Sequence, residues 1–229
     1  MGDQLFQEWQ VYEKLLIHDY MDHRAFFARL QAEVQIRFPR PLAILDLGCG
    51  DLTPVLPLLA ALPPARYVGV DESDVALAIA QRRLDELGLS GRLVEGDLLA
   101  ALEEISGPFD LILASFALHH LANPADKLLT LKRAGRLLSA DGFFALIDVF
   151  SAEAEPREIY VERWIENAKR RYRALQPGEK AMLFAHVRAR DFPLSLDAWR
   201  AAGLEAGLAR VEMLLEDRDG LNRLVTFAR

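Results

Sequence analysis

The chain has 229 residues, 52% of them apolar, which is enough to bury one substantial α/β core. Its formal net charge of −7 argues against a general nucleic-acid binder, because such a protein needs a basic surface to neutralise phosphates. Cys49 is the only cysteine, which excludes an intramolecular disulfide and a thiolate metal cluster, and we predict no metal site. The chain start lacks a basic segment followed by an apolar stretch, and no apolar run reaches membrane-spanning length, so we expect a cytoplasmic protein without membrane contacts.

Residues 4–38 carry apolar side chains at helical spacing, which predicts a helical cap over residues 1–40. Pro39 and Pro41 then end the helix. The apolar stripe of this helix consists of Phe6, Trp9, Leu15, Leu16, Phe26, Phe27, Leu30 and Val34.

A segment rich in polar aromatic groups, residues 18–24, interrupts the apolar stripe. Two interpretations stay open: a solvated junction between helices, or a lid over a bound ligand. In the lid, Tyr12 or Tyr20 would contact the substrate. Arg24 would bind a ligand carboxylate, because a guanidinium can hold a carboxylate through paired hydrogen bonds.

The stretch from residue 43 to 53 is an apolar run that contains Asp46, turns through Gly48 and Gly50, and leads into a helix over residues 55–62. This order predicts a buried parallel strand and a glycine turn at the carboxyl edge of an open sheet, where such sheets bind nucleotides. The two glycines lack Cβ atoms, so the backbone can bend sharply and a ligand can lie against it. A tight turn without a ligand is the alternative.

The next two predicted strands also end in acids. One runs from residue 66 to Asp71 and the other from residue 92 to Asp97. Asp71 follows the glycine turn by about twenty residues, the separation at which a dinucleotide-binding fold places the acid that holds the ribose. Carboxylates at neighbouring strand ends would repel one another unless a ligand or hydrogen-bond donors separated them. A fourth strand follows at residues 109–115, and residues 41–150 are predicted to form a cofactor-binding core.

These motifs resemble those of the class I S-adenosylmethionine-dependent methyltransferases. The resemblance implies S-adenosylmethionine as the cofactor and S-adenosylhomocysteine as the product. It also implies that Gly48 and Gly50 pass beneath the methionine part, that Asp71 holds the ribose and that Asp97 accepts a hydrogen bond from the adenine amino group. The motifs are Leu45-Asp46-Leu47-Gly48-Cys49-Gly50, Val68-Gly69-Val70-Asp71-Glu72-Ser73, Glu95-Gly96-Asp97-Leu98, Phe109-Asp110-Leu111-Ile112 and Leu118-His119-His120-Leu121. The cofactor-binding residues expected on this basis are Asp46, Gly48, Cys49, Gly50, Asp71, Glu72, Asp97, Leu98, Ser115 and Arg24.

Leu52 departs from the family pattern, since many members carry a third glycine there. A pyrophosphate site would suffer more from this side chain than a methionine site, which favours S-adenosylmethionine over a dinucleotide. Two alternatives to a methyltransferase stay open: a non-catalytic module that binds S-adenosylmethionine, and an oxidoreductase of the NAD type.

Strands and helices alternate through the core, with helices expected at 74–87, 98–104 and 125–138 and a fifth strand at 143–149. This alternation predicts a doubly wound, mostly parallel sheet, because parallel crossovers are right-handed and need a helix. The resemblance implies a seven-stranded Rossmann-like methyltransferase fold with an antiparallel last strand. We expect one domain over residues 1–229. It continues beyond the core as a helical insertion at 151–203, with helices at 155–175 and 177–190, and a final strand pair at 204–229, with strands at 208–215 and 221–227.

Methyl transfer from a sulfonium is an in-line displacement, so the protein chiefly aligns the reactants and excludes water. An acceptor with a proton of high pKa also needs a base. His119 and His120 follow the fourth strand at the carboxyl edge, where an imidazole can take a proton near neutral pH, and His120 is the preferred candidate. The alternative is that both rings are structural.

Substrate contacts are expected from the insertion, and the predicted acceptor is a small molecule. Tyr160 and Trp164 lie four residues apart and share a helix face, and with Phe184 and His186 they are candidates for an aromatic roof over the methyl donor. Packing in the core is the alternative, because aromatic residues at helical spacing are more often buried. The sequence leaves the identity of the acceptor and the oligomeric state open.

Overall fold

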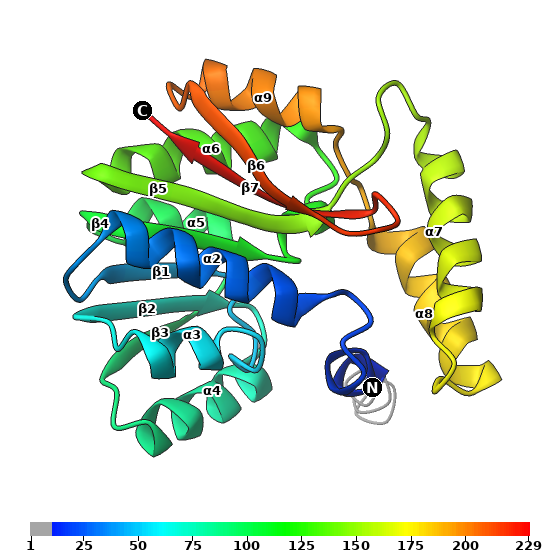
Figure 1. The fold of residues 1–229 in the computed structure, drawn as a ribbon, viewed down its shortest axis with the longest axis horizontal. Helices are drawn as coiled ribbons and strands as arrows, with labels where there is room; N and C mark the ends of the chain where they lie inside the picture. The colour runs from blue at the N-terminus through cyan, green and yellow to red at the C-terminus, as the bar shows by residue number, and fades with distance from the viewer. Residues whose placement is uncertain (1–10) are drawn as a thin grey trace.

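A seven-stranded sheet with the order β3-β2-β1-β4-β5-β7-β6 forms the centre of the fold in a computed structural model, which describes residues 11–229 (Figure 1). The strands from β1 to β5 pair in parallel, and β7 is antiparallel to both of its neighbours. The expected doubly wound sheet with an antiparallel last strand is therefore confirmed. The strands are β1 (Ala43–Leu47), β2 (Arg66–Asp71), β3 (Gly91–Glu95), β4 (Phe109–Ser115), β5 (Leu138–Val149), β6 (Arg210–Glu216) and β7 (Asn222–Ala228).

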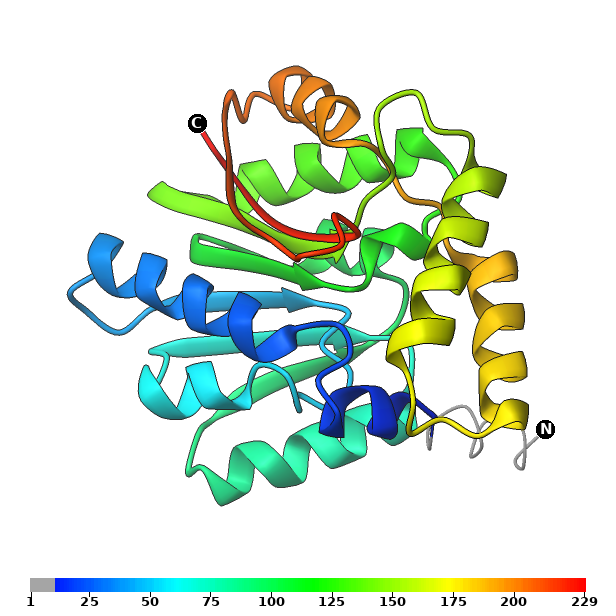
Figure 2. The ribbon, with the colours of Figure 1, turned by 45° about the vertical axis from the view of Figure 1, so that its right-hand side comes forward.

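Helices cover both faces of the sheet (Figures 1 and 2). The first face carries α2, α3 and α4, and the second carries α5, α6 and α9. In β1, Ile44 packs into the first layer and Leu45 into the second, because successive side chains of a strand point to opposite faces. The helices are α2 (His23–Arg37), α3 (Leu56–Ala61), α4 (Asp74–Glu86), α5 (Leu98–Glu104), η1 (Leu118–His120, a 3₁₀ helix), α6 (Pro124–Leu137), α7 (Arg157–Arg171), α8 (Pro177–Arg190) and α9 (Leu196–Glu205).

The insertion stands beyond the carboxyl ends of the parallel strands, where α7 and α8 lie side by side (Figure 2). The N-terminal helical segment, residues 11–17, packs against it. Lys14 forms an ion pair with Glu179 at 2.5 Å, and the Tyr20 ring stacks on Tyr172 with 4.4 Å between ring centroids. These two contacts join the N-terminal region to the insertion above the edge of the sheet. No helix in the described part of the chain has the length and apolarity needed to span a bilayer.

The helical region expected over residues 4–38 is divided, because the chain leaves helical geometry between residues 17 and 23. Asp19 and Asp22 have φ values of 50° and 56°, and left-handed residues end a right-handed helix. The segment is therefore a junction between two helices. Phe6 and Trp9 lie outside the described residues.

The fifth strand begins five residues earlier than expected, at Leu138 instead of residue 143. Gly142 lies inside the strand. A Cβ atom at Gly142 would lie 2.7 Å from the Phe109 carbonyl oxygen, so the glycine permits the close approach of β4 and β5 where their register shifts.

Candidate functional site

The glycine turn after β1 folds back onto the end of β2. The amides of Gly48 and Cys49 both donate to the Val70 carbonyl oxygen, at 2.8 and 3.0 Å. Gly48 and Gly50 have φ values of +72° and +51°, a region that favours glycine. A Cβ atom at Gly48 would lie 2.5 Å from Ala117 Cβ, whereas one at Gly50 would meet no atom within 4 Å. Gly48 therefore serves the packing of the chain after β4, and Gly50 borders open space.

Asp71 ends β2 beside this turn, and both of its carboxylate oxygens accept backbone hydrogen bonds. Oδ2 accepts from the Gly50 amide at 2.8 Å, and Oδ1 accepts from the Ser73 amide at 2.9 Å. These bonds fix the orientation of the carboxylate. Each oxygen keeps a further lone-pair site, so the group can still accept from two hydroxyls of a ligand.

The chain after β3 presents Gly96, Asp97 and Leu98 at the same edge of the sheet. Gly96 has a φ of +147°, and a Cβ atom there would meet no atom within 4 Å. Asp97 is exposed, and its Oδ1 accepts from the Ala100 amide at 2.9 Å, so it caps α5. Its other oxygen makes no hydrogen bond within residues 11–229. Glu72 is also exposed.

Ser115 ends β4, the strand next to β1. Its Oγ is buried and has no hydrogen-bond partner among the described residues. A buried polar atom without a partner is uncommon in folded proteins and calls for an explanation such as a ligand. The open space at Gly50, the oriented carboxylate of Asp71 and this hydroxyl fit an adenosyl ligand with ribose hydroxyls and a charged tail.

The side chains of Asp46 and Cys49 face the layer of α2, α3 and α4 instead of the open space. Asp46 is only 2% exposed and accepts a hydrogen bond from Tyr67 Oη at 2.9 Å. Burial, reinforced by the charge of Asp71, raises the pKa of Asp46 to about 7 against the effect of that hydrogen bond. The Cys49 thiol packs over Gly69, where a Cβ atom would lie 2.8 Å from Sγ, and burial raises its pKa. The expected role of these two side chains in cofactor binding is therefore corrected: they support the turn from behind.

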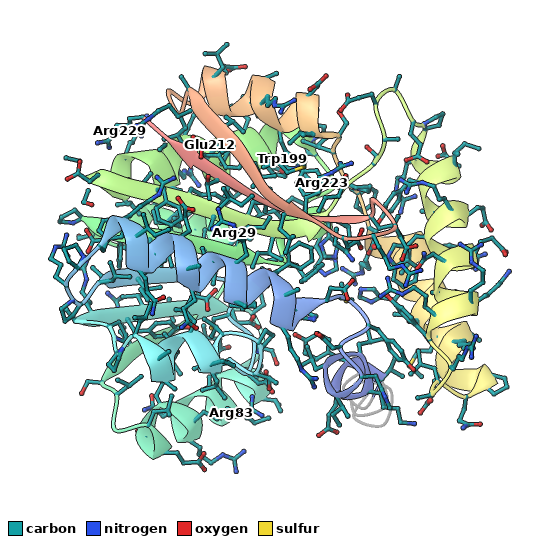
Figure 3. The ribbon with its side chains drawn as sticks, viewed as in Figure 1. Arg29, Arg83, Trp199, Glu212, Arg223 and Arg229 are labelled. Carbon is teal, nitrogen blue, oxygen red and sulfur yellow. The ribbon has the colours of Figure 1, made fainter. Side chains whose placement is uncertain are left out.

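Arg24 lines a cavity of about 730 Å³ between the N-terminal helical segment, α2, α3 and α4. Its guanidinium donates to the Ile17 carbonyl oxygen at 3.2 Å. Arg83, which lies on α4 (Figure 3), also lines this cavity and pairs with Asp51 at 2.5 Å. Among the described residues, Asp71, Asp97 and Ser115 do not line the cavity. Arg24 therefore lies in a cavity that reaches the residues after the glycine turn, Asp51 and Thr53, but not Asp71.

Tyr12 lies on the N-terminal helical segment and lines the same cavity. Burial raises its pKa, and the charges of Asp51 and Asp71 reinforce the effect. These charges act on Tyr12 because the segment covers the back of the glycine turn. Of the two tyrosines expected in a lid, Tyr12 thus lies near the turn.

Tyr20 lies farther along the N-terminal region and has a structural role. Its hydroxyl accepts a hydrogen bond from the Ala174 amide at 2.8 Å while its ring stacks on Tyr172. This pair of contacts fastens the helix junction to the loop between α7 and α8. We therefore place Tyr20 in the framework and not in the substrate site.

His119 is buried between two carboxylates. Its Nδ1 lies 2.5 Å from Asp148 Oδ1 at the end of β5, and its Nε2 lies 3.7 Å from Asp191 Oδ1. The His119 amide also donates to Asp148 Oδ2 at 3.1 Å. Burial opposes the charged ring, but the two aspartates outweigh it and raise the pKa of His119. Asp148 therefore fixes the orientation of the imidazole.

His120 has a different environment. Its Nδ1 lies 3.2 Å from the Arg190 carbonyl oxygen, and its ring centroid is 3.9 Å from that of His119 and 5.4 Å from that of His186. Desolvation, aided by the neighbouring His119, lowers the pKa of His120 to about 2, so the ring stays neutral near pH 7. A carboxylate therefore orients His119 and not His120, although the sequence favoured His120 as the base.

The aromatic residues of the insertion lie mainly in a hydrophobic cluster. Tyr160 and Trp164 are 0% and 4% exposed and pack with the N-terminal helical segment, and Phe184 is partly buried against them. This is the arrangement of core residues, which the sequence left as the alternative. Tyr160 also has a polar end near the histidines: its Oη has no hydrogen-bond partner in the described part of the chain, and Asp191 and Asp148 add to the burial that raises its pKa.

Asp148 and Asp191 were missed by the sequence-based reasoning. Asp148 lies next to the last residue of the fifth strand. It therefore shares the pattern of acids near strand ends by which Asp46, Asp71 and Asp97 were predicted as site residues. Asp191 follows α8 and has no comparable signal. The tertiary structure brings it to His119 from the far side of the insertion.

Comparisons with known proteins support a methyltransferase. Residues 45–144 match a family model described as "Methyltransferase domain". The release factor glutamine methyltransferase of Deinococcus radiodurans is 42% identical over 72 residues, 31% of this chain and 25% of that protein. The "Probable methyltransferase ltbC" of Aspergillus luteorubrus is 26% identical over 179 residues, 74% of this chain and 59% of that protein.

A methyltransferase of 4-amino-L-phenylalanine and 4-methylamino-L-phenylalanine from Streptomyces pristinaespiralis is 35% identical over 92 residues, 40% of this chain and 30% of that protein. The chain thus spans less than two thirds of the length of each of these relatives. Among solved structures, magnesium protoporphyrin IX methyltransferase from Synechocystis PCC 6803 with bound SAH has the same fold. Its TM-score is 0.63 at 18% identity, over 98% of this chain and 94% of that one.

Proposed function

We propose that this chain, which belongs to the class I S-adenosylmethionine-dependent methyltransferase family, transfers a methyl group from S-adenosylmethionine to a small-molecule acceptor. The observation that carries this proposal is the geometry of Asp71 and Gly50. An oriented carboxylate stands beside a turn that borders open space, at the carboxyl edge of a doubly wound sheet.

Four residues would hold the cofactor. Asp71 would accept from the ribose hydroxyls through its free lone pairs, and Gly50 would let the ligand lie against the backbone. Asp97 would accept from the adenine amino group through the oxygen that does not cap α5. The orphaned hydroxyl of Ser115 would donate to the methionine end. When bound, the cofactor supplies an electrophilic methyl group on a sulfonium.

The residues of the chain would align the acceptor and exclude water from it. η1 begins directly beside the glycine turn, because Ala117 occupies the space next to Gly48. The acceptor would therefore lie near His119 and His120. His119 is the better candidate to take a proton from an acidic acceptor, because Asp148 orients its ring through Nδ1 and leaves Nε2 for that proton. Tyr160 Oη would supply a further polar contact.

A small-molecule acceptor is supported by the relatives. The relative from Streptomyces pristinaespiralis acts, by its name, on an amino acid. The release factor relative modifies a protein, but it shares only 31% of this chain. α7 and α8 stand over the carboxyl ends of the strands, where the acceptor would lie, and the ion pair of Lys14 with Glu179 ties them to the N-terminal helical segment (Figure 2).

Calorimetry with S-adenosylhomocysteine tests cofactor binding. We expect the wild-type protein to bind and Asp71→Ala to weaken binding by about 1–3 kcal/mol, because ribose hydrogen bonds are lost. Asp74→Ala is the matched control, since Asp74 is an exposed carboxylate three residues farther along. Absence of binding by the wild type, or equal affinities of the two variants, would contradict the proposal.

The class of acceptor is tested by incubating the protein with radiolabelled methyl donor and a cell extract, then separating molecules by size. We expect the label in the low-molecular-weight fraction. The Asp71→Ala variant should transfer less label to that fraction. Label that appears only in the protein or nucleic-acid fraction would reject a small-molecule acceptor while leaving cofactor binding intact.

A further inference from the structure

We propose that His119, His120 and Asp191 form a binding site for one divalent transition-metal ion of the zinc type. Each residue offers one donor atom, and these atoms all lie within 4.8 Å of one another. Zinc–nitrogen and zinc–oxygen bonds of about 2.0–2.2 Å place donor atoms about 3.4 Å apart in a tetrahedral site. The 3.7 Å between His119 Nε2 and Asp191 Oδ1 is close to that spacing and too long for a hydrogen bond.

His119 turns the nitrogen without a proton toward the site, since its Nε2 faces Asp191. Asp148 accepts at His119 Nδ1, so the proton of the neutral ring lies on Nδ1 and Nε2 carries the lone pair. The Arg190 carbonyl oxygen faces His120 Nδ1 and selects the same tautomer. Metal-binding histidines in proteins almost always donate their other ring nitrogen to a carboxylate or a backbone carbonyl. In this cluster, His119 has the carboxylate of Asp148 as its partner, and His120 has the backbone carbonyl of Arg190.

The backbone holds the three residues together independently of any ion. The Phe192 amide donates to the His119 carbonyl oxygen at 2.8 Å, and the Asp191 amide donates to the Val187 carbonyl oxygen at 3.1 Å, which fixes the end of α8. Arg157 donates to the Asp191 carbonyl oxygen at 2.6 Å. A preformed donor set of this kind loses little entropy when it binds an ion.

The carboxylate of Asp191 supplies the second observation. Asp191 is 4% exposed, yet its side chain makes no hydrogen bond to the residues that the structure describes. A buried carboxylate without a hydrogen-bond donor is costly unless a cation is nearby. Asp148 adds a second negative charge behind His119, while Lys127 lies near Asp148 and Arg157 lies near Asp191. The two carboxylates thus face the two ring nitrogens of His119, Asp148 at Nδ1 and Asp191 at Nε2.

Two nitrogens and one oxygen are borderline donors, which suit zinc, cobalt, nickel and iron better than magnesium or calcium. Three protein donors leave at least one coordination position open. That position could take a heteroatom of the methyl acceptor, a step that rests on the proposed function. The ion and an accepted proton exclude each other at His119 Nε2, because both need the same lone pair.

Cobalt titration tests the site. The protein, without an affinity tag, is stripped with EDTA, dialysed and titrated with Co²⁺ at pH 7.5, and the visible ligand-field bands are recorded. We expect saturation at about one equivalent per chain and loss of the bands when Zn²⁺ is added. No methyl donor or acceptor is present, so this result does not depend on the proposed methyl transfer.

Variants separate the site from surface binding. Asp191→Asn and the more exposed His120→Ala should each weaken Zn²⁺ binding by more than about 100-fold, since loss of an outer partner alone costs about 10–100-fold. His18→Ala removes an exposed histidine of the helix junction and should bind as the wild type does. Circular dichroism establishes that each variant is folded. Absence of ligand-field bands in the wild type, or equal Zn²⁺ affinity of wild type, Asp191→Asn and His120→Ala, would overturn the proposal.

Discussion

His119 Nδ1 and Asp148 Oδ1 lie 2.5 Å apart in the interior, and this contact joins the segment after β4 to the end of β5. The two strands are neighbours in the sheet, so the pair holds together the two chain segments at their carboxyl ends. The same carboxylate accepts from the Val149 amide at 2.9 Å. Asp148 is therefore both a support for the histidine and a part of the strand end.

Removal of the Asp148 carboxylate should destabilise the protein strongly. Asp148→Ala should lower the free energy of unfolding by about 3–5 kcal/mol, because it leaves a buried imidazole and backbone amides without their partner. Asp148→Asn should lose less, since the amide oxygen can still accept from His119 Nδ1 and the backbone. Urea unfolding at pH 7 with EDTA measures both. The exposed control Asp85→Ala should stay within about 0.5 kcal/mol of wild type, and an equally small effect of Asp148→Ala would show that the pair is not structural.

The two glycines of the turn should respond differently to alanine. Gly48→Ala should lower stability by about 2–5 kcal/mol, because the left-handed φ and the contact with Ala117 both oppose a methyl group. Gly50→Ala should lower stability by only about 1–2 kcal/mol but weaken S-adenosylhomocysteine binding more than about tenfold, because its methyl group enters the open space. Urea unfolding and calorimetry on the same preparations separate the two effects. The prediction fails if Gly50→Ala binds as tightly as wild type.

Leu52 combines full burial with a left-handed φ of +68° at the position where the family often has glycine. Leu52→Ala should destabilise by about 2–5 kcal/mol through loss of buried surface. Leu52→Gly should destabilise by about 1 kcal/mol less than Leu52→Ala, because glycine relieves the backbone strain. Buried Leu58 in α3 is the matched site, where the glycine variant should be the worse of the two. Thermal or urea unfolding of the four variants gives the order, and the same order at both sites would contradict the strain argument.

His23 should make the protein less stable in mild acid. Its ring is buried against Phe116, with 4.8 Å between ring centroids, and burial lowers its pKa to about 4 although Asp19 opposes the shift. Between pH 6.5 and 4 the unfolded chain binds a proton that the folded chain does not, so stability falls as the pH falls through this window. His23→Phe should remove up to about 3 kcal/mol of that loss. Urea unfolding from pH 7 to pH 4 measures it, and parallel pH profiles of wild type and variant would refute the role of His23.

The sequence predicted the core of the fold because the relevant signals are local. A strand ends in an acid, a glycine turn or a helix cap follows it, and an amphipathic helix then leads to the next strand. This repeated order predicts a parallel sheet with helices on both faces. The turn around Gly48 and Gly50 is a local feature of this kind and forms as expected, and the Ser73 cap of α4 is another local feature. The sequence left a helix junction at residues 18–24 open as one of two interpretations, and it did not predict the early start of β5, because both features depend on contacts with the insertion and with β4.

The site was only partly accessible to the same reasoning. Asp71 and Asp97 could be proposed as cofactor-binding residues because the carboxyl end of a parallel strand fixes where the next side chain lies, and this role stays a prediction. The direction in which Asp46 and Cys49 point depends on which helix layer packs on that face of β1. The pattern of residues cannot show this before the layers are known.

The sequence by itself determined the sheet, the glycine turn and the acids at its edge, because short-range periodicity and turn chemistry encode them. Only the tertiary structure decided that His119, and not His120, pairs with a carboxylate, and that Asp191 approaches it from 72 residues farther along the chain. Such contacts form when the insertion docks over the sheet edge. That docking depends on the apolar burial of many side chains together. No local sequence pattern near the contacting residues therefore signals it.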